Sequence, residues 1–163
     1  MILDVTPDRS ADRPSRDSDV RPIVSGRLVA LVAVGGAVGT LARYWVESAW
    51  THDPHGVPWA TLVINLSGAG LLVALLTVLS TSGRGVHATA ELRAAFGTGL
   101  LGGWTTMSTL AVETVLLVDG GVASVALAYL AATIIGSVVV GLAARTVVLS
   151  VTVEREPGSE RAP

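Results

Sequence analysis

Four long apolar segments constrain the fold of this chain more than any other feature of its sequence. Each is close to the roughly 20 residues that an α-helix needs to cross a bilayer. Half of all residues are hydrophobic, so a soluble bundle would lack the polar side chains needed to coat four such helices. The sequence therefore predicts an all-α integral membrane protein with four transmembrane helices, over about Leu28–Val46, Trp59–Leu79, Leu92–Leu117 and Val122–Leu149.

The two ends of the chain are charged and differ from this apolar middle. Residues 1–25 and 151–163 hold little apolar surface, which predicts disordered tails around a membrane domain over 26–150. An even number of spans puts both tails on one side of the membrane, and the loops on the other side contain no arginine. Because arginine-rich segments stay in the cytoplasm, both termini are predicted to be cytoplasmic. The arginines on the tail side are Arg21, Arg27, Arg84, Arg93 and Arg145.

Composition argues against several other classes of protein. The chain has no cysteine, so it has no disulfide framework and no thiolate metal site. Its net charge of −2 gives no basic patch for nucleic acid. The sequence also shows no Ser-His-Asp set and no paired carboxylates, and its histidines fall in predicted loops. We therefore expect neither an enzyme nor a nucleic-acid-binding protein.

The stretch Gly97–Thr114 places polar groups inside a predicted span, where lipid offers them no partner. It contains six hydroxyl side chains, the pair Gly102-Gly103 and the carboxylate of Glu113. The glycine pair weakens the helix, so we expect the third helix to be broken there. Freed carbonyls at this depth must be buried, face water or coordinate a hard cation such as Na⁺. A simple glycine kink is the alternative, and Glu113 lies near enough to a helix end for a surface role.

Polar side chains also occur in the second and fourth spans. Asn65 lies about seven residues into the second span, near 10 Å deep at about 1.5 Å per residue. Tyr129, Thr133 and Ser137 repeat every four residues, so they form a row on one helix face. Each hydroxyl alone could bond back to its own helix. Taken with Asn65 and the third span, the row predicts a polar track.

Small residues predict close contacts between the helices. Gly35 and Gly39 are four residues apart, as are Gly99 and Gly103. Without Cβ atoms, helix backbones approach closely and gain van der Waals contact in lipid. Four helices enclose little interior for so many polar groups, so we also expect the chain to form a dimer.

Three stretches together carry a resemblance to a known family. They are GGAVGTLARYW at 35–45, WATLVINLSGAGL at 59–71 and GLLGGWTTMSTLAVE at 99–113. They resemble the Fluc, or CrcB-type, fluoride channels, and the resemblance covers about residues 28–148. It implies an antiparallel dimer of four-helix subunits in the bacterial inner membrane. Such a dimer exports fluoride from the cytoplasm along two pathways, with a structural Na⁺ at its centre.

The resemblance also implies roles for individual residues. Gly102 and Thr105 would lend backbone carbonyls to the Na⁺. Arg43 matches the arginine of the family's first helix, and Glu113 matches the acid near the end of its third. The fluoride pathway would include Asn65, Met107, Leu110, Tyr129, Thr133 and Ser137.

One departure from the family concerns Met107 and Leu110, where its members usually have phenylalanine. Aromatic ring edges are electropositive and can face an anion, which neither residue can reproduce. A heterodimer with an oppositely oriented partner chain fits both the missing phenylalanines and the one-sided arginines. A homodimer is the alternative assembly. A non-conducting structural subunit is another alternative. A small drug/proton exporter would need a carboxylate deep in the first helix, but Glu47 lies near that helix's end.

Overall fold

The computed structural model describes residues 25–50 and 53–153, and every regular element in this part of the chain is a helix. Four helical segments are long and apolar enough to cross a membrane, as the sequence predicted. The predictions for the tails fall almost entirely outside the described residues, although residues 151–153 still belong to the last helix. The helices are α1 (Gly26–Ala49), α2 (Trp59–Thr81), α3 (Val86–Leu92), η1 (Arg93–Leu101), α4 (Gly102–Trp104), α5 (Met107–Asp119) and α6 (Ala123–Val153).

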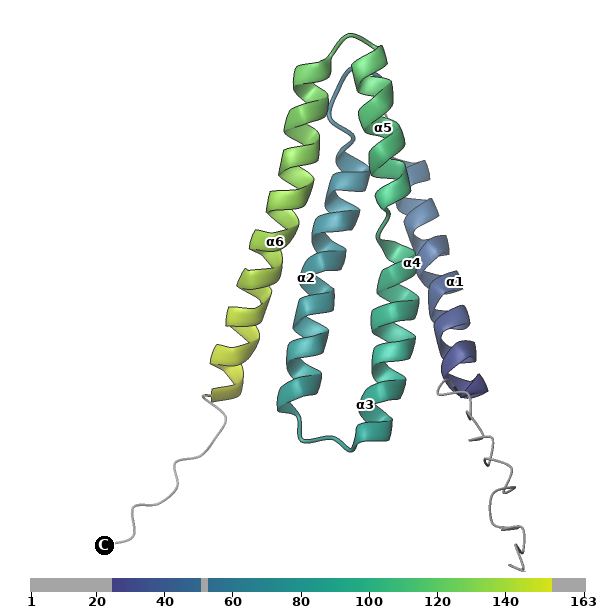
Figure 1. The fold of residues 1–163 in the computed structure, drawn as a ribbon, viewed down its shortest axis with the longest axis vertical. Helices are drawn as coiled ribbons and strands as arrows, with labels where there is room; N and C mark the ends of the chain where they lie inside the picture. The colour runs from purple at the N-terminus through teal and green to yellow at the C-terminus, as the bar shows by residue number, and fades with distance from the viewer. Residues whose placement is uncertain (1–24, 51–52, 154–163) are drawn as a thin grey trace, which may run out of the picture.

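The third span consists of α3, η1, α4 and α5, which follow one another almost end to end (Figure 1). The start of α1, the end of α6 and the connection between α2 and α3 lie at one end of the molecule. The connections that precede α2 and α6 lie toward the other end. This up-and-down arrangement is the topology expected for four consecutive spans.

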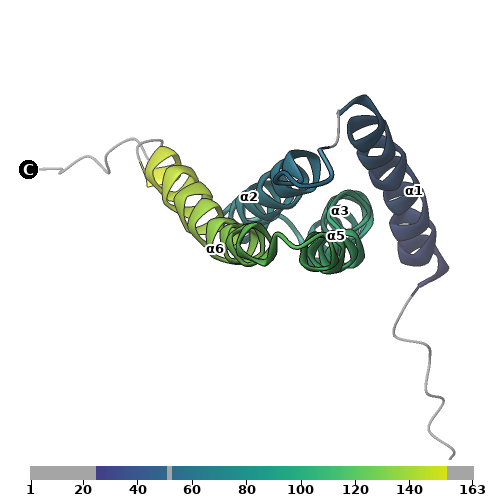
Figure 2. The same ribbon diagram turned by 90° about the horizontal axis from the view of Figure 1, so that it is seen from above.

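The third span changes its neighbours along its length. Its first part, η1 and α4, packs mainly against α1, whereas α5 packs against α6. The most extensive contact in the molecule joins α2 and α6. Viewed from above, α3 and α5 lie between α1 on one side and α6 on the other (Figure 2). The third span therefore joins the α2–α6 pair to α1.

Glycines permit the close contact between α1 and the third span. A Cβ atom on Gly35 would lie 2.9 Å from the backbone nitrogen of Leu100, and one on Gly39 would collide with the Leu100 carbonyl. On the facing side, a Cβ atom on Gly103 would collide with the main chain of α1, and one on Gly99 would lie 2.9 Å from another α1 carbonyl. The prediction of close packing at both glycine pairs is confirmed.

The third span is interrupted later than the sequence suggested. Gly102 and Gly103 are helical and belong to α4, whereas Thr105 has ψ 154° and Thr106 has φ −146° and ψ 123°. The expected break at the glycine pair is therefore wrong by about two residues. Gly103 serves contact with α1 instead, while the extended Thr106 is stabilised by a polar partner described below. The preceding η1 is a nine-residue π-helix, a form that occurs mostly as short bulges and often at functional sites.

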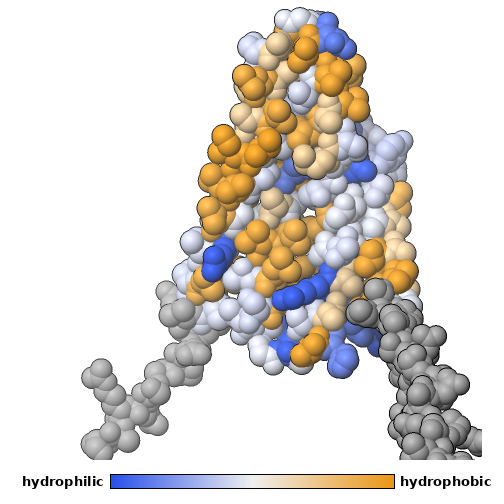
Figure 3. All heavy atoms as spheres, viewed as in Figure 1, coloured by the Kyte–Doolittle hydropathy of each residue, from blue (hydrophilic) through white to orange (hydrophobic). Residues whose placement is uncertain are grey.

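Much of the apolar surface is exposed in the isolated chain. A small core forms where α2, α5 and α6 meet, whereas the only buried residue of α1 is Gly39. Figure 3 shows apolar side chains over much of the visible face, including α6. Such a surface suits contact with lipid. The buried core residues are Leu62, Leu110, Leu117, Ala126 and Tyr129.

Candidate functional site

A groove of about 450 Å³ brings together most of the residues predicted for the ion pathway. α2, the third span and α6 form its walls, and exposed side chains such as Ile134 line it, so it opens onto the surface. Tyr129, Arg43 and Glu113 do not line this groove. The predicted residues that do are Asn65, Gly102, Thr105, Met107, Leu110, Thr133 and Ser137.

Asn65 holds the interruption of the third span in place. Its Nδ2 donates to the Thr106 carbonyl and its Oδ1 accepts from the Thr106 N–H, both at 2.9 Å. The side chain is only 6% exposed. This pair of bonds replaces those that Thr106 would make inside a continuous helix. Because one of its two N–H donors is already engaged, Asn65 offers an ion fewer donors than the sequence suggested.

Two further contacts fix the end of α4. The indole Nε1 of Trp104 donates to the Ser67 hydroxyl of α2 at 3.1 Å. From the other side, Arg43 Nε donates to the Gly103 carbonyl at 3.3 Å, and the same guanidinium pairs with Glu47 at 3.3 Å. Arg43 is thus a structural tie to the third span. Sequence reasoning missed Ser67 and Trp104, although a serine two residues after an intramembrane asparagine was a usable signal.

The interruption leaves backbone carbonyls available to a ligand. Thr106 N–H bonds to Asn65 rather than to the Gly102 carbonyl. Among the turn and cap hydrogen bonds of the described residues, none reaches the carbonyl of Gly102 or of Thr105. Both residues line the groove. The described residues contain no group of three His, Asp or Glu side chains that could hold a metal, whereas backbone carbonyls are oxygen ligands that suit a hard cation.

Glu113 is half-buried and lies between two hydroxyl donors. Tyr129 Oη donates to its Oε2 at 2.6 Å, and Thr61 Oγ1 donates to its Oε1 at 2.9 Å. Both donors are 1% exposed. The carboxylate therefore joins α5 to α2 and α6. Thr61 was missed, yet it precedes Asn65 by four residues and so lies on the same face of α2.

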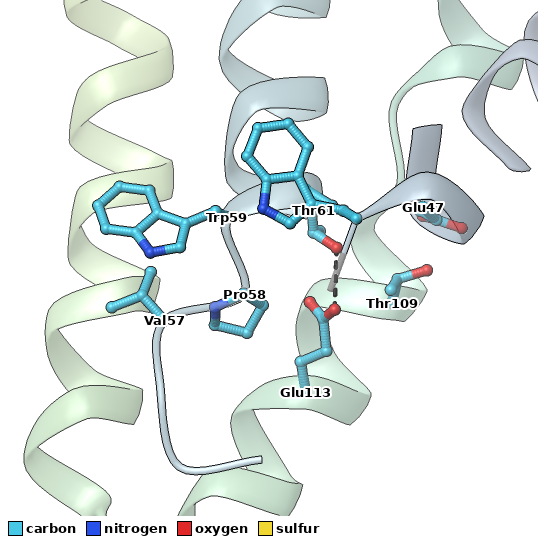
Figure 4. A pocket seen from close by; sticks show the side chains of 9 residues that line it. Glu47, Val57, Pro58, Trp59, Thr61, Thr109 and Glu113 are labelled. Carbon is cyan, nitrogen blue, oxygen red and sulfur yellow. Dashed lines mark hydrogen bonds between the residues drawn. The ribbon is translucent and has the colours of Figure 1, made fainter. Parts of the chain in front are cut away.

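A second pocket, of about 210 Å³, lies beside this carboxylate. Figure 4 shows Glu113 and Thr61 with their hydrogen bond, Thr109 and Glu47 nearby, and Trp59 at the start of α2. The pocket is therefore lined by carboxylates and hydroxyls together with aromatic side chains.

A polar row on α2 and α6 has members that line the pocket and others that line the groove. On α2, Thr61 is followed one turn later by Asn65. On α6, Tyr129, Thr133 and Ser137 follow at successive turns, which spans about 12 Å along the helix axis. Thr133 donates to the carbonyl of Tyr129 at 2.9 Å, so for this hydroxyl the back-bonded alternative is the one observed.

Met107 and Leu110 have different environments although both line the groove. Leu110 is 1% exposed and belongs to the core between α5 and α6. Met107 is 70% exposed, at the first position of α5 after the interruption. Met107 thus gives the groove an apolar, flexible side chain that is exposed on the surface of the isolated chain.

Comparison with known proteins places the chain in a family. Residues 30–147 match the family model described as CrcB-like protein, Camphor Resistance (CrcB). A Cutibacterium acnes protein named fluoride-specific ion channel FluC 1 is 50% identical over 97 residues, which are 58% of this chain and 64% of that protein. A Streptomyces avermitilis protein named fluoride-specific ion channel FluC 2 is 42% identical over 107 residues, 66% of each chain.

A third relative is covered more completely. An Anaeromyxobacter protein named fluoride-specific ion channel FluC is 40% identical over 120 residues, which are 72% of this chain and 92% of that protein. The chain spans slightly less than two thirds of the length of the Cutibacterium and Streptomyces proteins. The family model nevertheless covers all four membrane helices. The chain therefore belongs to the CrcB-like protein family.

Proposed function

We propose that this chain is a subunit of a fluoride-selective channel that lets fluoride leave the cytoplasm. The observation that carries the proposal is the polar row from the Glu113 pocket to the groove, in a family whose relatives bear the name of fluoride-specific ion channels. Fluoride is small and strongly hydrated, so a narrow pathway must replace its hydration shell with several hydrogen-bond donors, each of which binds the ion weakly. Hydroxyls of Tyr129, Thr133 and Ser137 supply such donors once they turn toward the ion.

The channel needs a second subunit in this proposal. The groove is open along one side, and its lining includes the exposed Met107. An oppositely oriented subunit set against this face would close the groove into a pathway. It would also bring the corresponding backbone carbonyls of the partner toward those of Gly102 and Thr105, and together they would hold a structural Na⁺. Both termini would lie in the cytoplasm, on the side of the arginine-rich ends.

The partner is proposed to be a different family member. Neither Met107 nor Leu110 offers an electropositive ring edge, so this chain supplies only part of a fluoride site. A homodimer is the competing assembly. A non-conducting subunit is the second candidate function, favoured by the hydroxyl of Thr133, which is bonded to its own helix.

Topology and complementation test the assembly together. A single cysteine placed at the C-terminus can be labelled without interference, because the chain contains none of its own. We expect a membrane-impermeant thiol reagent to label this cysteine only when the reagent has access to the cytoplasmic side. We also expect poor rescue of fluoride-sensitive cells by this chain alone, and full rescue with a family member that has phenylalanine at both substituted positions. Labelling from both sides with full rescue by the single chain would instead establish a dual-topology homodimer.

A further inference from the structure

A separate groove, away from the polar row, lies between the first turns of α1 and the start of the third span. Its volume is about 380 Å³. Ala88, Leu92 and Ala95 line one wall at the spacing of a single helix face, and Leu31 of α1 and Phe96 complete the apolar lining. The groove thus runs inward from the end of the span for about 12 Å, at the rise of an α-helix.

An arginine lies at the mouth of this groove. Arg84 belongs to the short connection between α2 and α3 and lines the groove. The acid that also lines it, Glu91, pairs with Arg27 at 3.0 Å. Arg84 forms no ion pair with any residue in the part of the chain that the structure describes. Among the described residues, the Arg84 guanidinium is therefore available to an occupant of the groove, whose one carboxylate, Glu91, is already paired.

We propose that this groove binds one anionic phospholipid, with the headgroup phosphate on Arg84 and an acyl chain along Leu31, Leu92 and Phe96. A guanidinium matches phosphate with two parallel hydrogen bonds. Arg84 lies just before a membrane span, at the depth where headgroups occur, and basic pockets between transmembrane helices bind anionic headgroups. Inorganic phosphate has no apolar part to contact the walls of the groove. The choline headgroup of a zwitterionic lipid would bring a second cation toward Arg84, so an anionic phospholipid fits the groove better than either.

Lipid retention on the purified full-length protein tests the proposal. The protein is reconstituted in vesicles of equal parts phosphatidylglycerol and phosphatidylcholine, extracted, and the retained lipid is counted by native mass spectrometry. We expect wild type to retain phosphatidylglycerol in preference. Arg84→Gln should weaken that preference about five-fold, the effect of one arginine near an anionic headgroup. Arg93→Gln changes an exposed arginine about two turns further along the third span that does not line the groove, and it should leave the preference unchanged.

A second pair of variants tests the apolar wall. Ala88→Trp should fill the groove and lower retention of both lipids, whereas Val86→Trp, at an 84% exposed position outside the groove, should not. If Arg84→Gln and Arg93→Gln lowered the preference for phosphatidylglycerol equally, surface charge alone would explain that preference, and the proposal would be overturned. Equal retention of both lipids by wild type, or displacement of phosphatidylglycerol by inorganic phosphate, would also overturn it. Arg84 forms no ion pair with another described residue, so Arg84→Gln should elute and melt like wild type, and a loss of phosphatidylglycerol preference at unchanged Tm reports the groove.

Discussion

Replacing Asn65 by leucine should destabilise the third span at its interruption. The change removes two buried hydrogen bonds of 2.9 Å and leaves the N–H and C=O of Thr106 without partners. Each unsatisfied buried group costs about 1–3 kcal/mol, so the expected loss is about 2–6 kcal/mol. Leucine has the same number of side-chain heavy atoms and the same branching as asparagine and is no smaller, so the loss reports the hydrogen bonds rather than a cavity.

Thermal unfolding in detergent measures this loss. A cost of about 2 kcal/mol corresponds to a fall in Tm of about 4–8 °C for a domain of this size, and larger costs give larger falls. The matched control is Ser137→Ala, in the same groove, where no side-chain hydrogen bond joins Ser137 to another described residue. Hydrogen exchange at the Thr106 amide should also accelerate in Asn65→Leu alone. If Asn65→Leu melts with the wild type and its Thr106 amide stays protected, Asn65 does not hold the interruption.

Four other substitutions address the remaining contacts. Tyr129→Phe removes the 2.6 Å bond to Glu113, so fluoride efflux should slow and stability should fall by about 1.5–3 kcal/mol; unchanged efflux would remove Tyr129 from the pathway. Gly39→Val should separate α1 from the third span and abolish folding, as seen by gel filtration. Outside its own stretch of helix, a Cβ atom at Gly102 meets one described atom, at 3.9 Å, so Gly102→Val should fold as a monomer but dimerise poorly. Normal dimers would argue against a dimer interface at Gly102. Ser137→Ala should slow efflux without lowering Tm, and unchanged efflux would exclude its hydroxyl.

The membrane helices could be predicted because hydropathy and length are local properties of the sequence. The predicted second span, Trp59–Leu79, corresponds to α2, Trp59–Thr81. The glycine pairs of α1 and the third span are in contact, as their spacing indicated. Lipid leaves a span few alternatives to a helix, so local reasoning is enough. The end of α6 was placed four residues too early, because the sequence gives no cap there.

The interruption could not be located from the sequence alone. Glycine is the residue that weakens an isolated helix, yet here two threonines are extended. Asn65, 41 residues before Thr106 in the chain, supplies both backbone partners of Thr106, which is a tertiary contact. The bond from Thr61 to Glu113 is likewise a tertiary contact, so the sequence did not indicate a role for Thr61. Polar side chains inside a span mark a site, but only the fold shows which of them pair with one another.

Fluoride efflux from proteoliposomes tests the central claim most directly. Vesicles loaded with equal fluoride and chloride would carry this chain together with a family member that has phenylalanine at the positions of Met107 and Leu110, and ion-selective electrodes would record both anions. Vesicles holding the partner alone are the control. The account predicts rapid fluoride release with chloride retained, and only when this chain is present. Fluoride retained by the two chains together, or chloride released as fast as fluoride, would contradict it.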